Sequence, residues 1–428
     1  MNKPDFNRTA FPANNFNVIK DKMLNWANQF SIFCFLDNHN YQIEPHSEEC
    51  LLAAGARRYI SCNAGNALEQ LQQFINEKSS WLFGHLGYDI KNEIENLSSS
   101  HPDGIQFPYL YFFEPEIIIR LNSTEMIIEA ENASAIFSAI NNTEIQQPPS
   151  SNKLEIKNRI EKVEYCNIIN KLKQHILRGD CYEINFCQEF YATNAEINPL
   201  VVYKKLSDLS PNPFSALYKL NDKWLLCASP ERYMKRRGPN ILSQPIKGTS
   251  KRNLQSIVED KKQRDDLYNS PKDRSENVMV VDLVRNDLAK VCKDGSVHVD
   301  ELYGIYSFPQ VHQMISTVSG ELKENISFSE IIKASFPMGS MTGAPKKRVM
   351  ELIERYEKTK RGIFSGAVGY INPDGDFDFN VVIRSIMYNA GTNYLSFSAG
   401  SGITFYSDAE KEWEECMMKA DAMREALK

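Results

Sequence analysis

The chain is organised around one stretch, PIKGTSKR at residues 245–252. Pro245 and Ile246 are typical of a turn inside a packed core, and Gly248 allows the backbone to approach a ligand or to adopt a positive φ angle. The stretch by itself fits a surface lysine at a turn. In a dry site, however, the Lys247 amine cannot stay unpaired without losing its proton. A buried Lys247 is therefore either ion-paired or a nucleophile activated by desolvation.

The composition is that of an ordinary soluble globular enzyme. The chain has 428 residues, of which 42% are apolar and 24% are charged. Its net charge of −6 and the lack of a polybasic run indicate neither nucleic acid nor an anionic membrane as a partner. No apolar run approaches the roughly 18 residues of a membrane span, and residues 1–13 lack the apolar segment of a signal peptide. We therefore expect a cytoplasmic protein.

The cysteines and histidines indicate neither disulfides nor zinc. Nine cysteines are scattered singly, without a C-x-x-C pair, which argues against a secreted disulfide framework. Seven histidines show no H-x-x-x-H or H-E-x-x-H spacing.

The N-terminal third reads as short strands followed by a linker. Residues 141–152, with PPSS at their centre, form the most loop-like segment. We place a boundary there, between an N-terminal segment (1–145) that packs on the core and a catalytic core (153–428). The strands expected before the boundary are residues 31–36, 80–88, 107–113 and 116–121.

The core begins with a helix and continues with alternating strands and helices. The helix over 271–291 is the clearest, with Ser270 as N-cap and Pro271 at its first position. A capping box of Ser407 and Glu410 is expected to open the last helix, 408–427. The other expected elements are helices over 165–178 and 345–357, strands over 180–191 and 224–228, and a meander of strands over 363–371, 377–388 and 393–398.

Two charged side chains stand where a cleft is expected. Glu231 follows a strand and a proline, so its carboxylate either points into a cleft or pairs with Arg232. Arg384 lies in the strand 377–388, sharing a face with Val382 and Ile386. An arginine on such a face needs an anion, either a carboxylate ligand or a structural partner. Small side chains at 399–402 would let backbone amides approach a ligand.

Acidic residues gather on two helices. Glu412, Glu415 and Lys419 lie along the edge of the buried stripe of the last helix. Two carboxylates one turn apart repel each other unless a cation lies near. Together with Glu276 they could supply the sparse oxygen set that Mg²⁺ takes. Solvated glutamates on helix faces are the alternative.

These stretches, taken in order, resemble the chorismate-utilising enzymes, a family that includes anthranilate synthase component I, aminodeoxychorismate synthase component I, isochorismate synthase and salicylate synthase. The resemblance covers essentially residues 155–428, and residues 84–89 also look like the family pattern G-x-x-G-Y-D. The matching stretches are GDCYEIN (179–185), SPE (229–231), PIKGT (245–249), ENVMVVDLVRND (276–287), TGAPK (342–346), GAVGY (366–370), IRS (383–385), AGSG (399–402) and residues 412–419.

The resemblance implies a fold and a set of site residues. The fold would be α+β, a large two-layer antiparallel β-sandwich with helices packed outside. Glu231 would be the general acid that protonates a departing hydroxyl. Glu276 and Glu415, with Glu412 nearby, would hold Mg²⁺ against the ring carboxylate of chorismate. The implied substrate contacts are Tyr370, Arg384 and the amides of Gly400, Ser401 and Gly402 at the enolpyruvyl carboxylate, Gly248 and Thr249 at the ring, and Lys419 near the carboxylates.

Lys247 makes the chain resemble the aminodeoxychorismate synthases more than the other members of the family. Anthranilate synthases usually carry alanine there, whereas aminodeoxychorismate synthases with lysine are thought to attack C2 of chorismate as the C4 hydroxyl departs. Ammonia then enters at C4 and expels the lysine, giving 4-amino-4-deoxychorismate for para-aminobenzoate and folate synthesis. This route needs an uncharged amine.

The chain shows no glutaminase pattern, so the resemblance implies that a separate glutamine amidotransferase subunit supplies the ammonia. Anthranilate synthase component I and a non-catalytic chorismate-binding subunit remain as alternatives.

Three positions depart from the family pattern. Glu183 stands where water-using members carry lysine and amide-using members usually carry glutamine, which speaks against water as the incoming nucleophile. Gln313 replaces a family histidine, with His312 one place earlier. The Leu-Leu-Glu-Ser motif for tryptophan is FLDN at 35–38, so tryptophan binding is not implied.

Overall fold

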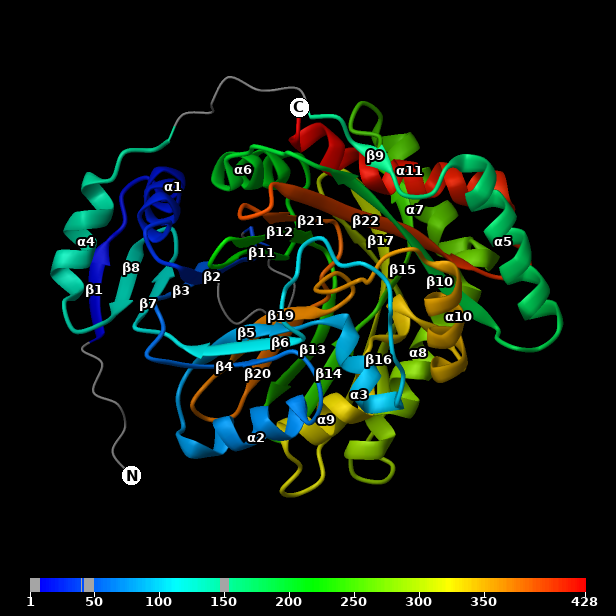
Figure 1. The fold of residues 1–428 in the computed structure, drawn as a ribbon, viewed down its shortest axis with the longest axis horizontal. Helices are drawn as coiled ribbons and strands as arrows, with labels where there is room; N and C mark the ends of the chain where they lie inside the picture. Colours follow the sequence, from blue (N-terminus) through cyan, green and yellow to red (C-terminus); the bar gives the residue numbers. More distant parts are fainter. Residues whose placement is uncertain (1–7, 40, 42–49, 147–153) are drawn as a thin grey trace.

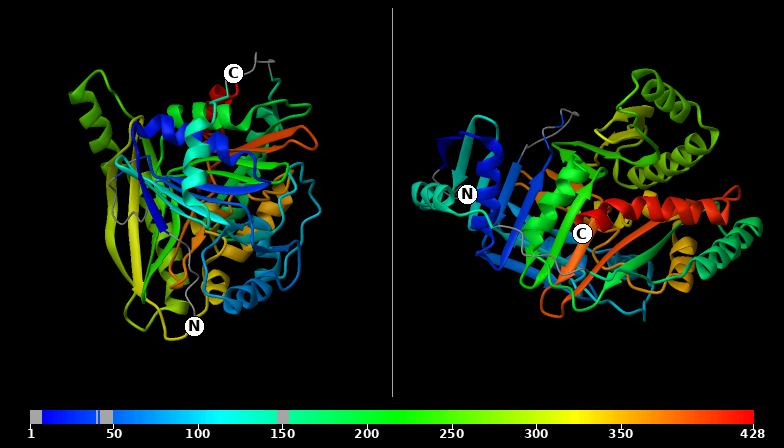
Figure 2. Two further views of the ribbon diagram at one scale, coloured as in Figure 1. Left: turned by 90° about the vertical axis from the view of Figure 1, so that its left-hand side faces the viewer. Right: turned by 90° about the horizontal axis from the view of Figure 1, so that it is seen from above.

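Two antiparallel sheets stacked face to face form the body of the molecule. The structure is a computed structural model that describes residues 8–39, 41, 50–146 and 154–428. Within these ranges the sheets have 12 and 10 strands, and helices lie on their outer faces (Figures 1 and 2). The expected α+β fold, a two-layer antiparallel β-sandwich with helices outside, is confirmed.

The larger sheet is buried on both faces. In β2 (Ile32–Asp37), Cys34 packs between the sheets, while Phe33 and Phe35 pack beneath the outer helices. Side chains alternate between the two faces of a strand, so burial on both faces requires a continuous apolar run. The remaining strands, in spatial order, are β1 (Arg8–Pro12), β8 (Glu125–Glu129), β7 (Ile117–Leu121), β3 (Cys50–Ala54), then β2, β11 (Phe214–Leu220), β12 (Lys223–Ser229), β21 (Ser385–Asn389), β22 (Tyr394–Ile403), β10 (Glu183–Ala192) and β18 (Gly343–Ala344), with β9 (Lys157–Asn158) on β10.

The smaller sheet faces the larger one across the core. Phe83 lies in this shared core, on the same face as His85, whose ring meets Tyr218 of the larger sheet. Phe112 and Phe379 lie on the opposite face and pack on Phe328. The strands, in spatial order, are β15 (Ile246–Lys251), β17 (Val311–Glu321), β14 (Asn240–Gln244), β13 (Arg232–Arg237), β20 (Phe377–Asn380), β19 (Ala367–Ile371), β5 (Leu82–Leu86), β6 (Leu110–Glu114) and β4 (Arg58–Cys62), with β16 (His298–Ser307) on β17.

The helices place their apolar stripes on the sheets. Leu172, Leu206 and Cys416 join one cluster with the outer face of the larger sheet. In the described ranges no helix is both long and apolar enough to cross a membrane. The helices are α1 (Phe16–Ala27), α2 (Ala67–Glu77), α3 (Lys91–Glu95), α4 (Ala133–Asn142), α5 (Lys162–Leu177), α6 (Pro199–Leu209), α7 (Ile257–Asn269), α8 (Pro271–Val291), α9 (Phe328–Ser335), α10 (Lys346–Tyr356) and α11 (Ala409–Ala426), with 3₁₀ turns η1 (Tyr88–Ile90) and η2 (Gly339–Met341).

Local capping explains where the two long site helices begin. Helix α8 has the predicted bounds, and the Ser270 hydroxyl accepts a hydrogen bond from the Asp273 amide. Helix α11 starts one residue later than predicted, because Asp408 caps the Lys411 amide. The predicted capping box of Ser407 and Glu410 is therefore wrong, since the Ser407 hydroxyl accepts from Thr404 instead.

Two segments cross side by side between the sheets. The predicted strand 377–388 is wrong, because its first part is β20 in the smaller sheet and its last part is β21 in the larger one. Arg384, on the crossing, has a φ of 50°, so it cannot share a strand face with Val382 and Ile386. Residues 229–231 cross next to it, since the Val381 amide donates to the Glu231 carbonyl at 3.0 Å.

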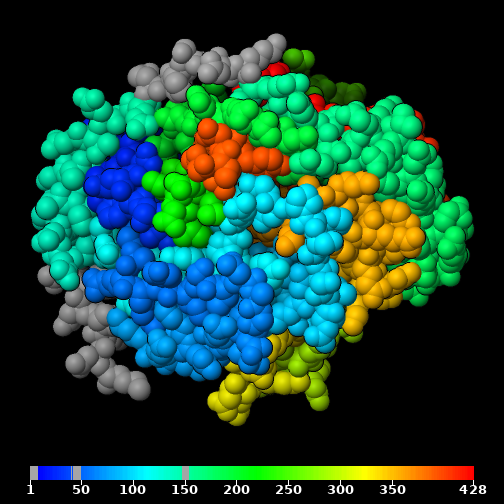
Figure 3. Space-filling view, in the orientation of Figure 1, coloured from blue at the N-terminus to red at the C-terminus, as the bar shows by residue number. Residues whose placement is uncertain are grey.

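Both parts of the chain contribute to both sheets. Strand β2 lies between β3 and β11, and β5 lies between β6 and β19. Figure 3 shows the early segments (blue and cyan) covering one face beside late segments (orange). The predicted linker centre, 148–151, lies outside the described residues, and the division into 1–145 and 153–428 stays a prediction.

Candidate active site

Lys247 lies at the start of β15 and is ion-paired. Its side chain is 9% exposed, and Nζ donates to Oε1 of Glu183 at 2.6 Å. Gly402 makes room for the pair, because a Cβ there would lie 2.6 Å from Glu183 Oε1 and 2.8 Å from Lys247 Nζ. Of the two possibilities for a buried lysine, the structure shows the ion pair.

This pairing keeps a proton on Lys247. Burial lowers the pKa of the amine, but the carboxylates of Glu183 and Glu276 outweigh burial and raise it above its usual value. The expectation of an uncharged amine is wrong for this state of the protein. The proton must leave before the nitrogen can act as a nucleophile.

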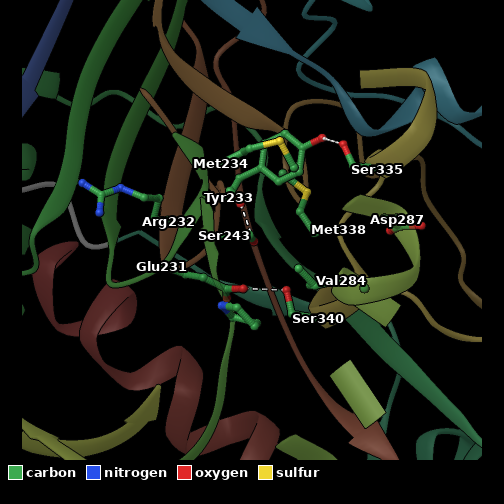
Figure 4. A pocket seen from close by; sticks show the side chains of 12 residues that line it. Glu231, Arg232, Tyr233, Met234, Ser243, Val284, Asp287, Ser335, Met338 and Ser340 are labelled. Carbon is green, nitrogen blue, oxygen red and sulfur yellow. Dashed lines mark hydrogen bonds between the residues drawn. The ribbon is translucent and has the colours of Figure 1, made fainter. Parts of the chain in front are cut away.

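Glu231 carries a carboxyl suited to proton donation. It follows β12, and its Oε1 accepts a hydrogen bond from the Ser340 hydroxyl at 2.6 Å (Figure 4). Burial raises the pKa of Glu231 to about 7, against the opposing effects of Ser340 and Lys247. The predicted alternative, a salt bridge with Arg232, is not formed, because that guanidinium pairs with Asp378 at 2.9 Å.

A small cavity of about 20 Å³ lies beside the Glu231–Ser340 pair. Its lining also includes Val284 and Met338, which Figure 4 shows beside this pair. Lys247 and Arg384 are not among the residues that line it. The cavity therefore reaches the site from the Glu231 side.

Arg384 is a half-buried cation whose charge acts on this acid. Burial lowers the pKa of its guanidinium, and the charge of Glu231 opposes that effect. Within the described ranges its guanidinium makes no salt bridge. The alternative of a structural ion pair thus has no support in these ranges, and an anionic ligand would supply the missing partner.

The predicted acidic residues of α8 and α11 come together around a lysine that the sequence analysis did not single out. Glu276 and Glu412 are buried, and Glu415 is half-buried. Figure 2 (right) shows α11 (red) beside the yellow-green region that contains α8. The Lys272 Nζ lies 3.8 Å from Glu276 Oε1, 3.5 Å from Glu412 Oε1 and 4.0 Å from Glu415 Oε2.

These carboxylates suit Mg²⁺ in chemistry but are spread apart. Glu276 Oε1 is buried and has no hydrogen-bond partner in the structure, so it is an oxygen that a cation could satisfy. Among the described residues, no group of three or more His, Cys, Asp or Glu is arranged to hold a metal. The donor set fits a magnesium ion only if the ammonium of Lys272 withdraws.

The predicted small-residue segment 399–402 belongs to β22, which extends beyond the expected strand 393–398. Gly400 pairs with Cys187, and a Cβ there would lie 2.0 Å from the Phe186 carbonyl oxygen. The Ser401 hydroxyl donates to Glu412 Oε2 at 2.5 Å. The role of the amides of Gly400, Ser401 and Gly402 in binding a carboxylate stays a prediction.

Lys419 connects this strand to the acidic helix. Its Nζ lies 2.7 Å from Glu415 Oε1 and donates to the Gly400 carbonyl at 3.0 Å. Its predicted role near the substrate carboxylates stays a prediction.

Gly248, Thr249 and Gln313 lie where β15 meets β17. Gly248 has the expected positive φ, 96°, and the exposed Thr249 pairs with Gln313. Both amide atoms of Gln313 are buried without a hydrogen-bond partner. Leaving such groups unpaired costs about 1–3 kcal/mol each, so Gln313 is a residue that a ligand could satisfy.

Tyr370 lies apart from the other predicted contacts. It lines a second cavity together with Leu36, Asn38 and Asp378, and packs on Trp81 with ring centroids 5.3 Å apart. Lys247, Glu231 and Arg384 are not among the residues that line this cavity.

Sequence reasoning missed Ser340 and Lys272. Ser340 is 109 residues from Glu231 along the chain, and no local pattern connects them. Lys272 precedes Glu276 by one helical turn, so the i, i+4 spacing on the predicted helix could have indicated it.

Comparisons with known proteins agree with this architecture. The family model described as chorismate binding enzyme matches residues 25–425. The chain therefore belongs to the family of chorismate-binding enzymes.

Several relatives share most of the chain. It is 32% identical over 372 residues to an anthranilate synthase component I-like protein of Synechocystis, covering 85% of this chain and 75% of that protein. It is 31% identical over 361 residues to aminodeoxychorismate synthase component 1 of Bacillus subtilis, covering 80% of this chain and 76% of that protein. The structure of anthranilate synthase component I from Streptococcus pneumoniae has a TM-score of 0.76 at 24% identity, over 90% of this chain and 94% of that chain, and supports the fold.

Proposed function

We propose that the chain is the chorismate-converting component of an aminodeoxychorismate synthase, which makes 4-amino-4-deoxychorismate from chorismate and ammonia. The observation that carries this proposal is Lys247, buried in the site between a carboxylate that can take its proton and a carboxyl that can give one. The relative named aminodeoxychorismate synthase component 1 supports it.

The proton on Lys247 leaves first. Glu183, 2.6 Å from Nζ, is the base within reach, and its carboxylate becomes a carboxylic acid as the amine becomes neutral. The neutral nitrogen then attacks C2 of chorismate, the two conjugated ring double bonds (C1=C2 and C5=C6) shift to C1=C6 and C4=C5, and the C4–O bond breaks. Glu231, whose pKa of about 7 leaves it partly protonated at neutral pH, gives its proton to the departing oxygen, so that water leaves.

Ammonia completes the exchange. It attacks C4, the two double bonds shift back to C5=C6 and C1=C2, and the bond between C2 and Lys247 breaks. The proton that the incoming nitrogen sheds returns to a carboxylate, and the lysine regains the proton held by Glu183. A chain with Glu183 at this position keeps a base beside the lysine.

Arg384 and the acidic cluster would hold the two carboxylates of the substrate. The buried guanidinium of Arg384 suits the enolpyruvyl carboxylate. Glu276, Glu412 and Glu415 would hold Mg²⁺, which when bound would neutralise the ring carboxylate. A glutamine amidotransferase subunit would supply ammonia, in line with the component naming of the relatives.

The test is the substitution pattern of the product. The protein is incubated with chorismate, MgCl₂ and ammonium chloride, and the product is identified by mass spectrometry and NMR. We expect 4-amino-4-deoxychorismate, and we expect Lys247→Ala to reduce its formation by at least 100-fold. Lys251→Ala, an exposed lysine of the same strand, is the matched control and should leave the rate unchanged.

Two outcomes would contradict the proposal. Anthranilate with release of pyruvate would establish the second candidate, anthranilate synthase component I, which the Synechocystis relative favours. Full activity in Lys247→Ala would remove the covalent route.

A further inference from the structure

We propose that Lys272 is the resident counter-ion of the acidic cluster, and that a divalent cation binds there only by displacing its ammonium group. The cluster is defined as Glu276, Glu412 and Glu415. The inference rests on the magnesium site of the proposed function, but it concerns the affinity for the ion and not the reaction.

The position of Lys272 is central and is held by charge. Its Nζ lies 3.5–4.0 Å from one oxygen of each carboxylate. Contacts of this length are ion pairs without the short geometry of a charge-assisted hydrogen bond. Three carboxylates from two helices repel one another, so a cation at the centre stabilises the approach of Glu412 and Glu415 of α11 to Glu276 of α8.

The ammonium leaves part of the cluster unsatisfied. Glu276 Oε1 is buried and lacks a hydrogen-bond partner, although it faces Lys272 Nζ at 3.8 Å. Magnesium binds carboxylate oxygens at about 2.0–2.1 Å. The carboxylates therefore stand wider apart than an ion of that size requires, which agrees with the lack of a ready metal-binding group in the described ranges.

Lys272 has a route out of the cluster. Its side chain is 49% exposed, and it lies in the first turn of α8, so the ammonium can move into water while its aliphatic stem stays on the helix. The other nearby cations stay in place, because Lys419 pairs with Glu415 and Lys247 pairs with Glu183. The single positive charge of Lys272 then leaves the cluster as the two positive charges of the divalent cation arrive.

The exchange makes opposite predictions for the empty and the loaded protein. Without a divalent ion, Lys272 stabilises the cluster. With the ion, Lys272 is a competitor whose charge weakens binding. Even in water, a charge about 4 Å away changes the binding affinity of an ion by about fivefold. Removing the competing ammonium should therefore tighten ion binding by at least that factor.

The experiment measures ion binding without substrate. Isothermal titration with MgCl₂ compares the parent with Lys272→Gln, with Lys272→Arg, which keeps the charge, and with Lys347→Gln, the same change at an exposed lysine of α10. We expect Lys272→Gln to bind Mg²⁺ at least about fivefold more tightly, while the other two bind like the parent. Thermal unfolding in EDTA should show a lower midpoint for Lys272→Gln only, and excess MgCl₂ should restore it.

Equal or weaker Mg²⁺ binding by Lys272→Gln, or an unchanged midpoint in EDTA, would overturn the proposal. These measurements do not involve the reaction, so an anthranilate product would refute the proposed function and leave this inference standing.

Discussion

Lys247 and Glu231 hold protons for different physical reasons. Neighbouring carboxylates, chiefly Glu183, raise the pKa of Lys247 against its burial. Burial itself raises the pKa of Glu231, against its hydrogen bond from Ser340. The site thus combines a lysine that is charged because of its partner with an acid that stays partly protonated near pH 7 because it is enclosed.

The pH dependence of the reaction should report Glu231. A general acid acts when protonated, so activity is present below its pKa and is lost as the pH rises through it. With a pKa of about 7, we expect kcat/KM for chorismate to fall tenfold per pH unit above about 7.5. Ser340→Ala removes a hydrogen bond that lowers this pKa, so its alkaline limb should move to higher pH.

A profile that is flat between pH 7 and 9, or a limb that does not move in Ser340→Ala, would exclude Glu231 as the acid.

At the scale of elements, the pairing of β10 with β22 creates the space for the ion pair. Asn185 pairs with Gly402, and this register brings Glu183 and Lys247 against the backbone of β22. A side chain at residue 402 would occupy the place of the two charged groups. The glycine thus fits a close approach by charged side chains and not a turn.

Gly402→Ala should separate Lys247 from Glu183. Because the added methyl group would lie 2.6–2.8 Å from both charged atoms, we expect the unfolding free energy to fall by about 1–3 kcal/mol. Amination of chorismate should fall at least tenfold. Chemical denaturation and the product assay measure the two effects, and a fully active Gly402→Ala protein would show that the pair is dispensable.

Elements with local signals were predictable, and the crossing between sheets was not. Helix α8 carries its own start in Ser270 and Pro271, so its bounds follow from the sequence. Apolar side chains precede and follow the crossing in the run 377–388, and Phe379 of β20 and Met387 of β21 join one buried cluster. Alternation cannot reveal a crossing of this kind. The N-cap of α11 was misplaced by one residue because Ser407 and Asp408 are both good caps.

At the scale of the whole molecule, the early strands complete both layers. Strand β11 has seven residues, and it pairs with β2 from Ser215 to Leu220. Strand β19 pairs with β5. Without residues 8–146, both sheets would expose unpaired interior edges.

We therefore expect residues 154–428 alone to aggregate or to lack cooperative unfolding. Co-expression with residues 1–146 should restore a folded complex. Size-exclusion chromatography and circular dichroism provide the measurement. A monomeric, cooperatively folded fragment 154–428 would instead establish the predicted boundary as one between independent units.

The family motifs named several residues that the structure brings together, because these motifs are short, ordered and chemically specific. They could not give the state of Lys247, which depends on Glu183, a residue 64 positions away. They also could not give Lys272, whose position depends on how α8 packs against α11. Such charges are set by tertiary contacts, which sequence spacing reports only within one helix or strand.

The two neighbouring segments that cross between the sheets determine the distance between Glu231 and Arg384. Glu231 and Arg384 each sit on a segment that passes from one layer to the other, and backbone hydrogen bonds join these two segments. The distance between the Glu231 carboxyl and the Arg384 guanidinium is therefore set by the separation of the two sheets. Substitutions in surface loops leave this distance unchanged. A larger side chain between the sheets would increase it without contacting either residue.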